Sequence, residues 1–589
     1  MSKKKDLVSR QLVKYLEHMG VEYVFGLCGH TNIAVLSELE NSSIKFVNTR
    51  HEQVATHMAD GYARVKKKAS VVLTHVGPGL TNAVTGVATA ALDSIPMVVI
   101  AGDIPTHFYG KHPHQEVNLH ADASQYEILR PVVKRAWRVD RPDLFPEIIS
   151  KAFQLAESGR PGPVLVSVPM DIFSKEIEVE LFEKVKHHTK KLHKPSMDRE
   201  VAEEIVKKLV EAKNPLIYVG GGVILADAAE ELKEFVEHLN IPVVHSAMGK
   251  GALSDDHPLL MGLTGFWGSE FVNKKTKEAD YILALGTRFA EADCSSWEEE
   301  YTFNFPPTKL IHIDIDPNEI GRNYPVEIGV VADLKQALTV LNKAAKELVP
   351  NGIVNEKIKQ EIAEYKKEFM ENNLEFIQSD AFPMRPERIL HEVREVLPKD
   401  GYITTDVGWN KNGVAQRFPI YKAGTVLTPG GLATMGFGSP AALGAKIAAP
   451  DKVVISLVGD GGFGQNPSVL ATAVEENIPV IWVVMNNRSY GVIAGLQKAH
   501  FDTTYGTIFR KNNGEEYTPD FASMARAFGV EGVKINSADE FKPALQKAIA
   551  ANKPYLIDVS TLNVPTPTSG HWNILDIYSP GEKKGHVAT

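Results

Sequence analysis

Two apolar runs flank a short helical pattern in the stretch VVISLVGDGGFGQNPSVLATAVEENIPVIWVVMNN, residues 453–487. Each run is apolar without alternation, which is typical of a parallel strand buried on both faces. The segment between them has apolar residues at helical spacing, namely Val469, Leu470, Ala473 and Val474. The stretch therefore predicts a strand–helix–strand unit of a doubly wound parallel sheet, in which both strands end at the same ligand-binding edge.

Polar residues follow both strands at that edge. Asp460 stands after the first strand and Asn487 after the second, and both offer oxygen ligands. Mg²⁺ prefers oxygen ligands, usually takes only one or two carboxylates and often shares them with phosphates. Gly459, Gly461 and Gly462 would let a phosphate approach the backbone at the start of a helix. The pattern predicts a Mg²⁺ and phosphate site, with a glycine-rich turn that binds nothing as the alternative.

The length of the chain requires more than one such unit. With 589 residues it exceeds what a single core usually supports, and we expect roughly three or four domains. A net charge of −9 disfavours nonspecific binding to nucleic acid or anionic membrane. Two cysteines, Cys28 and Cys294, imply no disulfide framework, and no apolar run has the length of a membrane span. We expect a cytoplasmic protein that acts on a small molecule.

Apolar strand patterns fall into three blocks. They predict three doubly wound α/β domains with parallel sheets, and a C-terminal tail, over residues 1–180, 195–345, 375–565 and 566–589. The charged stretch KEIEVELFEKVKHHTKKLHKP, residues 175–195, is interpreted as a linker. A second charged stretch, residues 355–373, has a helical pattern and leads into the third block.

The first and third blocks contain similar segments. VVLTHVGPGLTNAVTGVATAALDSIPMVVIAGD in the first block and residues 453–487 in the third share a strand, a glycine turn, a small-residue helix, Ile-Pro and a second strand. Related units at opposite ends of a chain suggest two similar sheets that face each other across a ligand. A general likeness between any two strand–helix–strand units is the alternative.

The motifs of the chain resemble those of thiamine diphosphate enzymes, and among them the acetolactate synthase and pyruvate oxidase group. The resemblance covers about residues 5–565 and rests on VFGLCGH, RHEQVATHMADGYAR, GPGLTN, HQE, GRPGPV, GGGV, GTRF, HIDIDP, GGLATMGFGSPAALGA and the GDG to NN spacing. It implies that the first block binds the aminopyrimidine ring of the cofactor and the third its diphosphate and Mg²⁺. The two blocks of one site would come from different subunits of a homodimer or homotetramer.

The resemblance also implies roles for individual residues. Glu52 would hydrogen-bond the aminopyrimidine ring and relay a proton, and Met435 would hold the two rings in a bent geometry. Cofactor contacts would come from Glu52, Pro78, Asn82, Trp409, Asn410, Gly431, Met435, Gly459, Gly461, Gly462, Ser489, Tyr490 and Gly491. The Mg²⁺ ligands would be Asp460, Asn487 and Ser489.

The substrate side departs from acetolactate synthase. His30 stands where that enzyme has glycine, and His75 adjoins GPG near a catalytic histidine of benzoylformate decarboxylase-like members. Two imidazoles there could exchange protons with a substrate near neutral pH. Gln115 matches the family and would contact the substrate, whereas Leu496 replaces a tryptophan. Lys134 would lie at a channel mouth, and the HPH sequence around His114 lacks a second pair of ligands for a metal site.

The middle block resembles a flavin site. The residues concerned are Gly220, Gly221, Gly222, Arg288, Asp314 and Asp333. The arginine and backbone amides would hold a pyrophosphate. FAD is therefore a possible cofactor, with ADP or an empty block as alternatives, because the FAEAD sequence after Arg288 differs from the pattern of the synthases.

These observations lead to three hypotheses on function. The first is an acetolactate synthase-like enzyme that forms an enamine or carbanion on thiamine diphosphate from a 2-keto acid and transfers it to an acceptor. The second keeps the cofactor but makes the chain a C–C bond hydrolase or lyase acting on a 1,2-diketone or 2-hydroxyketone, which the two histidines would suit. The third is a noncatalytic nucleotide-binding subunit, against which Glu52 argues.

Overall fold

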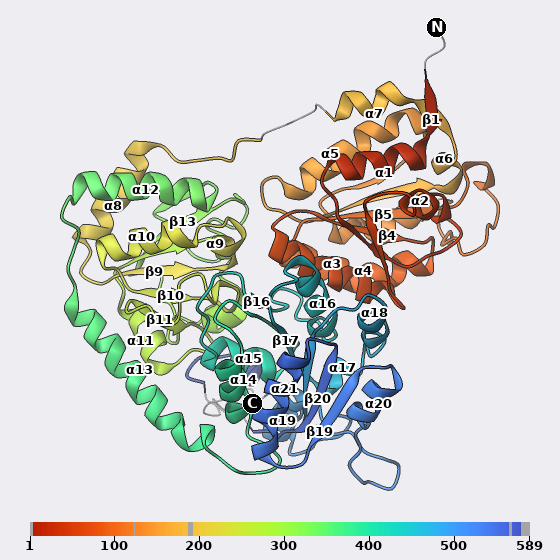
Figure 1. The fold of residues 1–589 in the computed structure, drawn as a ribbon. Helices are drawn as coiled ribbons and strands as arrows, with labels where there is room; N and C mark the ends of the chain where they lie inside the picture. Colours follow the sequence, from red (N-terminus) through yellow and green to blue (C-terminus); the bar gives the residue numbers. More distant parts are fainter. Residues whose placement is uncertain (1–3, 123, 187–191, 565–567, 579–589) are drawn as a thin grey trace.

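The computed structural model describes residues 4–122, 124–186, 192–564 and 568–578. It contains three six-stranded sheets in which all paired strands are parallel. Figure 1 shows them as three units in chain order, coloured red to orange, yellow to green, and teal to blue. Three doubly wound α/β units were predicted from the sequence, and this fold class is confirmed.

The N-terminal sheet has the strand order β3-β2-β4-β5-β7-β6. Its strands are β2 (Tyr23–Gly26), β3 (Lys45–Asn48), β4 (Ser70–Thr74), β5 (Met97–Asp103), β6 (Ala136–Arg138) and β7 (Pro163–Pro169). Its helices are α1 (Val8–His18), α2 (Ile33–Leu39), α3 (Glu52–Lys66), α4 (Pro78–Leu92), α5 (Phe145–Glu157), α6 (Met170–Phe173) and α7 (Val179–Val185). A small antiparallel pair, β1 (Lys5–Leu7) and β8 (Glu176–Glu178), lies outside this sheet.

The central sheet has the order β11-β10-β9-β12-β13-β14. Its first strand in sequence lies in the middle, which is the strand order of a dinucleotide-binding fold. The strands are β9 (Pro215–Val219), β10 (Val243–His245), β11 (Leu260–Leu263), β12 (Tyr281–Leu285), β13 (Lys309–Asp314) and β14 (Ile328–Val331). The helices are α8 (Arg199–Glu211), α9 (Gly221–Leu225), α10 (Ala229–Leu239), α11 (Glu270–Glu278), α12 (Leu334–Leu348) and α13 (Glu356–Ile377).

The C-terminal sheet has the order β16-β15-β17-β18-β20-β19, which repeats the topology of the N-terminal sheet strand for strand. Its strands are β15 (Tyr402–Thr405), β16 (Val426–Leu427), β17 (Val454–Gly459), β18 (Ile481–Asn486), β19 (Glu531–Ile535) and β20 (Tyr555–Ser560). Its helices are α14 (Pro386–Val396), α15 (Trp409–Arg417), α16 (Gly438–Ala448), α17 (Asp460–Phe463), α18 (Val469–Glu475), α19 (Gly491–Phe501), α20 (Phe521–Ala527), α21 (Phe541–Ala551) and α22 (Ile574–Tyr578). The likeness inferred from sequence therefore extends to the whole topology.

The N- and C-terminal units share one hydrophobic core, whereas the central unit has its own. Helices α3 and α16 cross in the shared core, and Figure 1 shows α16 directly below α3 and α4. The crossing is close because a Cβ on Gly61 would lie 2.2 Å from the carbonyl oxygen of Ala441, and one on Gly444 would lie 1.9 Å from that of Met58. Glycine at both positions lets the two backbones touch.

Two predictions about connecting segments met different outcomes. The helix expected over residues 355–373 is confirmed as α13. The linker predicted over residues 175–195 is wrong in its first half, which forms β8 and α7, because Ile177, Phe182 and Val185 are buried in the N-terminal core. These apolar residues outweigh the charges between them. Residues 187–191, and parts of the tail predicted over 566–589, lie outside the described residues, and the predicted domain limits stay a prediction.

Candidate active site

Asp460 lies where β17 meets α17, and it is 4% exposed. Its Oδ1 accepts a hydrogen bond from the backbone N–H of Gly461 at 3.0 Å, whereas Oδ2 is buried without a partner among the described residues. Burial raises the pKa of this carboxyl to about 6. An unpartnered buried carboxylate oxygen is costly, and a cation placed there would satisfy it.

The neighbouring strand brings Asn487 and Ser489 to the same edge, because β17 pairs with β18 from Ile455 to Gly459. The Oδ1 atom of Asn487 accepts from the Ser489 backbone N–H at 3.2 Å. The Ser489 hydroxyl is also buried without a partner in the described part of the chain. The three predicted metal ligands thus follow two adjacent strands, and two of them hold oxygen atoms that lack partners.

Neighbouring groups leave little room for a side chain at several of the glycines around Asp460. A Cβ on Gly461 would lie 2.7 Å from the ring of Tyr490, and one on Gly462 would lie 2.7 Å from the Asp406 carboxylate. A Cβ on Gly459 would make an ordinary contact with the Asn410 side chain at 3.8 Å, whereas one on Gly491 would meet Asn487 and Asn563. Gly461, Gly462 and Gly491 are therefore needed for close approach of backbone and side chains, as expected for a phosphate-binding turn.

The side chains of two further residues predicted to contact the cofactor form hydrogen bonds within the protein. The Asn410 side chain accepts from the backbone N–H of Asp406 at 2.9 Å and donates to the carbonyl of Val407, so it holds the turn after β15. The indole N–H of Trp409 donates to the carbonyl of Val564 at 2.6 Å. Gly431 and Met435 belong to the partly exposed loop that precedes α16.

On the N-terminal unit, Glu52 is the first residue of α3 and is 4% exposed. Its Oε2 accepts a hydrogen bond from the side-chain amide of Asn82 at 3.0 Å. Pro78 begins α4, where its fixed φ suits the first turn, and Asn82 lies one turn further on. The sequence predictions Glu52, Pro78 and Asn82 therefore meet at the starts of two neighbouring helices.

His75 is held by hydrogen bonds on both ring nitrogens. Nδ1 lies 2.8 Å from the Thr31 hydroxyl and accepts weakly from the Thr31 backbone N–H at 3.4 Å, while Nε2 lies 2.8 Å from Gln115 Oε1. Because an amide oxygen accepts and does not donate, this arrangement fits the tautomer that carries its proton on Nε2. Gln115 has φ of 67°, and its carbonyl packs against Gly77. His75 thereby fixes the predicted substrate-binding amide.

His30 and His114 are more open. The ring of His30 lies 4.5 Å from that of His75 and 6.1 Å from that of His114, centroid to centroid. Among the described residues neither His30 nor His114 has a hydrogen-bond partner. Burial and the two neighbouring imidazoles lower the pKa of His30. His114 and Thr31 were not predicted as site residues, although His114 immediately precedes Gln115 in the sequence.

The structure gathers the predicted residues into two separate groups. Within the described residues, no hydrogen bond or ion pair joins Glu52 and the histidines to the group around Asp460. Two other sequence expectations receive a structural explanation. The Lys134 ammonium donates to the carbonyls of Leu155 and Ser158 and so caps the end of α5, and its location at a channel mouth stays a prediction. Leu496 is 7% exposed and packs on the inner side of α19.

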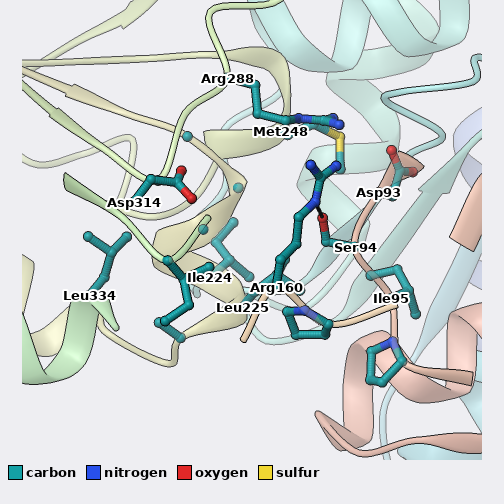
Figure 2. A pocket seen from close by; sticks show the side chains of 18 of the residues that line it. Asp93, Ser94, Ile95, Arg160, Ile224, Leu225, Met248, Arg288, Asp314 and Leu334 are labelled. Carbon is teal, nitrogen blue, oxygen red and sulfur yellow. Dashed lines mark hydrogen bonds between the residues drawn. The ribbon is translucent and has the colours of Figure 1, made fainter. Parts of the chain in front are cut away.

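A cavity of about 1020 Å³ lies where the three units meet. All six residues of the predicted flavin site line it: Gly220, Gly221, Gly222, Arg288, Asp314 and Asp333. Figure 2 shows Asp314 and Leu334 on one side and Asp93, Ser94 and Ile95 on the other, with Arg160, Arg288 and Met248 between them. The volume is at the upper end of the roughly 300–1,000 Å³ typical of ligand pockets.

Hydrogen bonds and ion pairs of charged side chains connect the walls of this cavity, and these contacts were not predicted from the sequence. Asp93 accepts from the backbone N–H groups of Gly430 and Gly431 at 3.1 and 2.6 Å and pairs with Arg64 at 2.7 Å. Arg160 crosses from the N-terminal unit to Glu319 at 2.7 Å in the central unit. Burial raises the pKa of Asp314, at the end of β13, to about 6. These contacts close the cavity around the carboxyl ends of the central strands.

The fold and these two groups of residues define a thiamine diphosphate enzyme, and comparison with known families agrees. Residues 7–124, 202–341 and 406–559 match the N-terminal TPP binding domain, the central domain and the C-terminal TPP binding domain of the thiamine pyrophosphate enzymes. The chain belongs to this family of enzymes. No helix in the described part of the chain combines the length and apolar character needed to cross a membrane.

Within the family the chain is similar to large subunits of acetolactate synthase. It is 35% identical over 596 residues to a probable acetolactate synthase large subunit of Methanococcus aeolicus, covering 97% of this chain and 96% of the relative. It is 36% identical to the corresponding probable subunit of Methanocaldococcus jannaschii, covering 93% and 90%. Identity to the large subunit of acetolactate synthase isozyme 3 of Escherichia coli K12 is 34%, covering 94% of each chain.

Proposed function

We propose that this chain decarboxylates a 2-keto acid and transfers the remaining fragment to an acceptor carbonyl, as an acetolactate synthase-like carboligase with thiamine diphosphate and Mg²⁺. The observation that carries the proposal is that, among the described residues, Asp460 Oδ2 and the Ser489 hydroxyl are both buried without a partner. Asp460 lies on the glycine-rich turn after β17, and Ser489 follows the adjacent strand β18. This set of oxygen atoms fits a Mg²⁺ ion that also binds phosphate. When bound, thiamine diphosphate supplies the electron sink for the reaction.

The protein contributes positioning and proton transfer. Asp460, Asn487 and Ser489 would hold the ion against the diphosphate. Glu52, fixed by Asn82, would hold a proton at the aminopyrimidine ring. Gln115 offers its amide N–H₂ to a substrate oxygen because its own oxygen already accepts from His75. The acceptor would then be oriented by a side chain that needs no rearrangement.

The proposal is tested by identifying products. The purified protein is incubated with pyruvate, alone and with a second 2-keto acid, and the products are identified by mass spectrometry. We expect CO₂ release and a 2-hydroxy-3-keto acid that form only with thiamine diphosphate and Mg²⁺ together. Reactions without the cofactor or with excess EDTA are the controls. If no 2-keto acid gives a cofactor-dependent product, the proposed reaction is wrong.

A second candidate is a C–C bond hydrolase or lyase acting on a 1,2-diketone or 2-hydroxyketone. The observation that favours it is the cluster of His30, His75 and His114, in which the imidazoles of His30 and His114 have no hydrogen-bond partner among the described residues and can exchange protons with a carbonyl or hydroxyl group. Replacing His30 or His75 with Ala should leave proton exchange at thiazolium C2 unchanged but lower turnover or alter the products. Open and cyclic 1,2-diketones, incubated as above, distinguish cleavage from ligation. Unchanged turnover and products in both variants would make these histidines structural.

Three finer features complete the proposal. FAD, in the cavity lined by Gly220, Arg288 and Asp314, is supported by the glycine turn after β9 and by a guanidinium that has no partner among the described residues. A homodimer or homotetramer with active sites between subunits is supported by the separation of the two groups of site residues. A cytoplasmic location is supported by the small number of cysteines, two in the whole chain.

A further inference from the structure

Three side chains of the N-terminal unit form a hydrogen-bonded relay that runs from Thr31 through His75 to Gln115. Thr31 follows β2 and His75 follows β4, and these strands are neighbours in the sheet, so both residues reach the same edge. Thr31 and His75 are buried, with exposed fractions of 1% and 6%. Gln115 is exposed, and its side-chain nitrogen has no hydrogen-bond partner in the described part of the chain. The relay therefore connects the interior of the unit to a group that a ligand can reach.

The contacts of Thr31 assign a direction to the relay. The Thr31 hydroxyl oxygen accepts a hydrogen bond from the backbone N–H of Val76 at 3.2 Å, and its other contact is His75 Nδ1 at 2.8 Å. The Thr31 backbone N–H, which can only donate, faces the same Nδ1 at 3.4 Å. This arrangement fits donation from both Thr31 groups to Nδ1, with the ring proton on Nε2 and directed at Gln115 Oε1.

Close packing holds the first two members of the relay in place. A Cβ on Gly29 would lie 2.3 Å from the His75 ring, and one on Gly102, in β5, would lie 2.4 Å from Thr31 Oγ1. Contacts this short exclude a side chain at either glycine. The ring and the hydroxyl thus occupy space that two further segments of backbone leave for them.

The relay adjoins the residue that is proposed to hold a proton at the aminopyrimidine ring. Gly79, in the first turn of α4, lies between the two, since a Cβ there would lie 3.0 Å from His75 Cβ and 3.4 Å from Glu52 Oε1. The support of Gln115 is therefore next to the proposed catalytic group and not at a remote surface.

The direction of the relay decides what Gln115 offers to a ligand. An amide side chain has an accepting oxygen at one end and two N–H donors at the other, and the two ends are nearly equal in shape. When Oε1 is bound to the Nε2–H of His75, the end that faces a ligand carries only donors. Such donors favour a carbonyl or carboxylate oxygen, which only accepts.

We propose that Thr31 is a positioning residue that sets the tautomer of His75 and thereby keeps Gln115 a hydrogen-bond donor to the substrate. This inference rests on the proposed function, because the substrate group concerned is the carbonyl or carboxylate oxygen of the 2-keto acid. Thr31 acts through His75 and not by contact with the substrate. Without the Thr31 hydroxyl, Nδ1 keeps only the weak backbone contact, and the ring and the exposed amide can exchange their donor and acceptor ends together.

The first measurement does not depend on turnover. Full-length protein labelled with ¹⁵N at its histidines is examined by NMR, and the His75 signals are identified by their loss in His75→Gln. Wild type and Thr31→Ser should show a protonated Nε2 and an unprotonated Nδ1. Thr31→Val, which keeps the shape of the side chain without its hydroxyl, should show both ring nitrogens partly protonated. A proton on Nδ1 in wild type, or an unchanged ring in Thr31→Val, would overturn the inference.

The second measurement is kcat/KM for the 2-keto acid that the product screen identifies. Thr31→Val should lower it by about 3- to 10-fold, the usual cost of one lost neutral hydrogen bond, and Thr31→Ser should restore it. Exchange at thiazolium C2 should stay at the wild-type rate. Thr89→Val is the matched control, because the Thr89 hydroxyl is also buried but donates to the carbonyl of Thr85 within α4.

A double-variant cycle separates positioning from a general structural effect. In a Gln115→Ala background, Thr31→Val should cause no further loss, since it acts through that amide. An equal loss with and without Gln115 would overturn the inference. Thr31→Ala replaces Thr31→Val if thermal unfolding shows that the valine variant does not fold. A screen in which no 2-keto acid gives a product would overturn the substrate assignment together with the proposed function, whereas the His75 signals would still decide the role of Thr31.

Discussion

Asp460 is the residue that most strongly indicates a metal site. Its Oδ2 is buried without a partner among the described residues, and native proteins rarely bury a carboxylate oxygen in that way. Replacing Asp460 with Ala should weaken the binding of thiamine diphosphate and Mg²⁺ together, by more than the ~10–100-fold that loss of an outer-shell metal partner costs. Titration with the cofactor, followed by circular dichroism, measures this. Asp451→Ala, at an exposed position of the same unit, is the control. Unchanged affinity in Asp460→Ala would show that the metal lies elsewhere.

The prediction for Glu52 differs from that for Asp460, because the proposed role of Glu52 is proton transfer and not cofactor binding. In Glu52→Gln the amide oxygen can still accept from Asn82, so cofactor affinity should change little. Hydrogen–deuterium exchange at thiazolium C2 should slow by at least ~10²-fold, the usual cost of losing a positioned acid or base. NMR detection of the C2 proton measures it, and Glu40→Gln, exposed on the same unit, is the control. Exchange at the wild-type rate would remove Glu52 from the proposed mechanism.

At the scale of elements, the crossing of α3 and α16 joins the two terminal units. Any side chain at Gly444 would meet the backbone of Met58, which cannot move away as a flexible side chain can. Gly444→Ala should therefore lower the free energy of unfolding by about 1–3 kcal/mol, the range for overpacked cores. Chemical denaturation measures the loss, and Ala449→Val, just beyond the end of the same helix, should have a much smaller effect. Equal stability of Gly444→Ala and wild type would mean that the crossing is looser than described.

The elements with uniform patterns were predictable. Strands β17 and β18 are continuous apolar runs in the sequence because both of their faces are buried. The buried face of α18 is formed by Val469, Leu470 and Ala473, which recur at helical spacing. Asp460 and Asn487 could be placed at one edge because parallel neighbours end together. The local sequence pattern predicts a strand or helix when the burial of that element follows the same pattern along its whole length.

Features that depend on distant segments could not be predicted. The charges of residues 175–195 suggested a linker, but burial of Phe182 and Val185 is decided by α1 and α5, which are far away in sequence. The bond from His75 to Gln115 needs a left-handed residue in a loop 40 positions away. Thr31 looks like an ordinary loop threonine until the end of β4 places His75 beside it. Sequence motifs thus identified the cofactor class better than the shape of the substrate pocket.

At the scale of the whole molecule, the repeated topology places two similar sheets on one shared core. Each sheet carries half of the residues that the family would need for one active site. The Glu52 group lies at the strand ends of the N-terminal sheet, and the Asp460 group lies at those of the C-terminal sheet. No hydrogen bond or ion pair in the described part of one chain connects the groups. A second copy related by two-fold symmetry could supply each group with its complement.

Mixing two inactive variants tests this arrangement directly. If each site combines Glu52 of one chain with Asp460 of another, a mixed dimer of Glu52→Gln and Asp460→Ala chains has one site with both substitutions and one with neither. Random mixing of equal amounts should then restore about a quarter of wild-type activity, since half of the dimers are mixed and half of their sites are intact. The two variants carry different tags and are co-expressed so that their chains assemble at random. Each variant expressed alone is the control. If both groups belonged to one chain, every site would carry a substitution, and the mixture would be as inactive as its components.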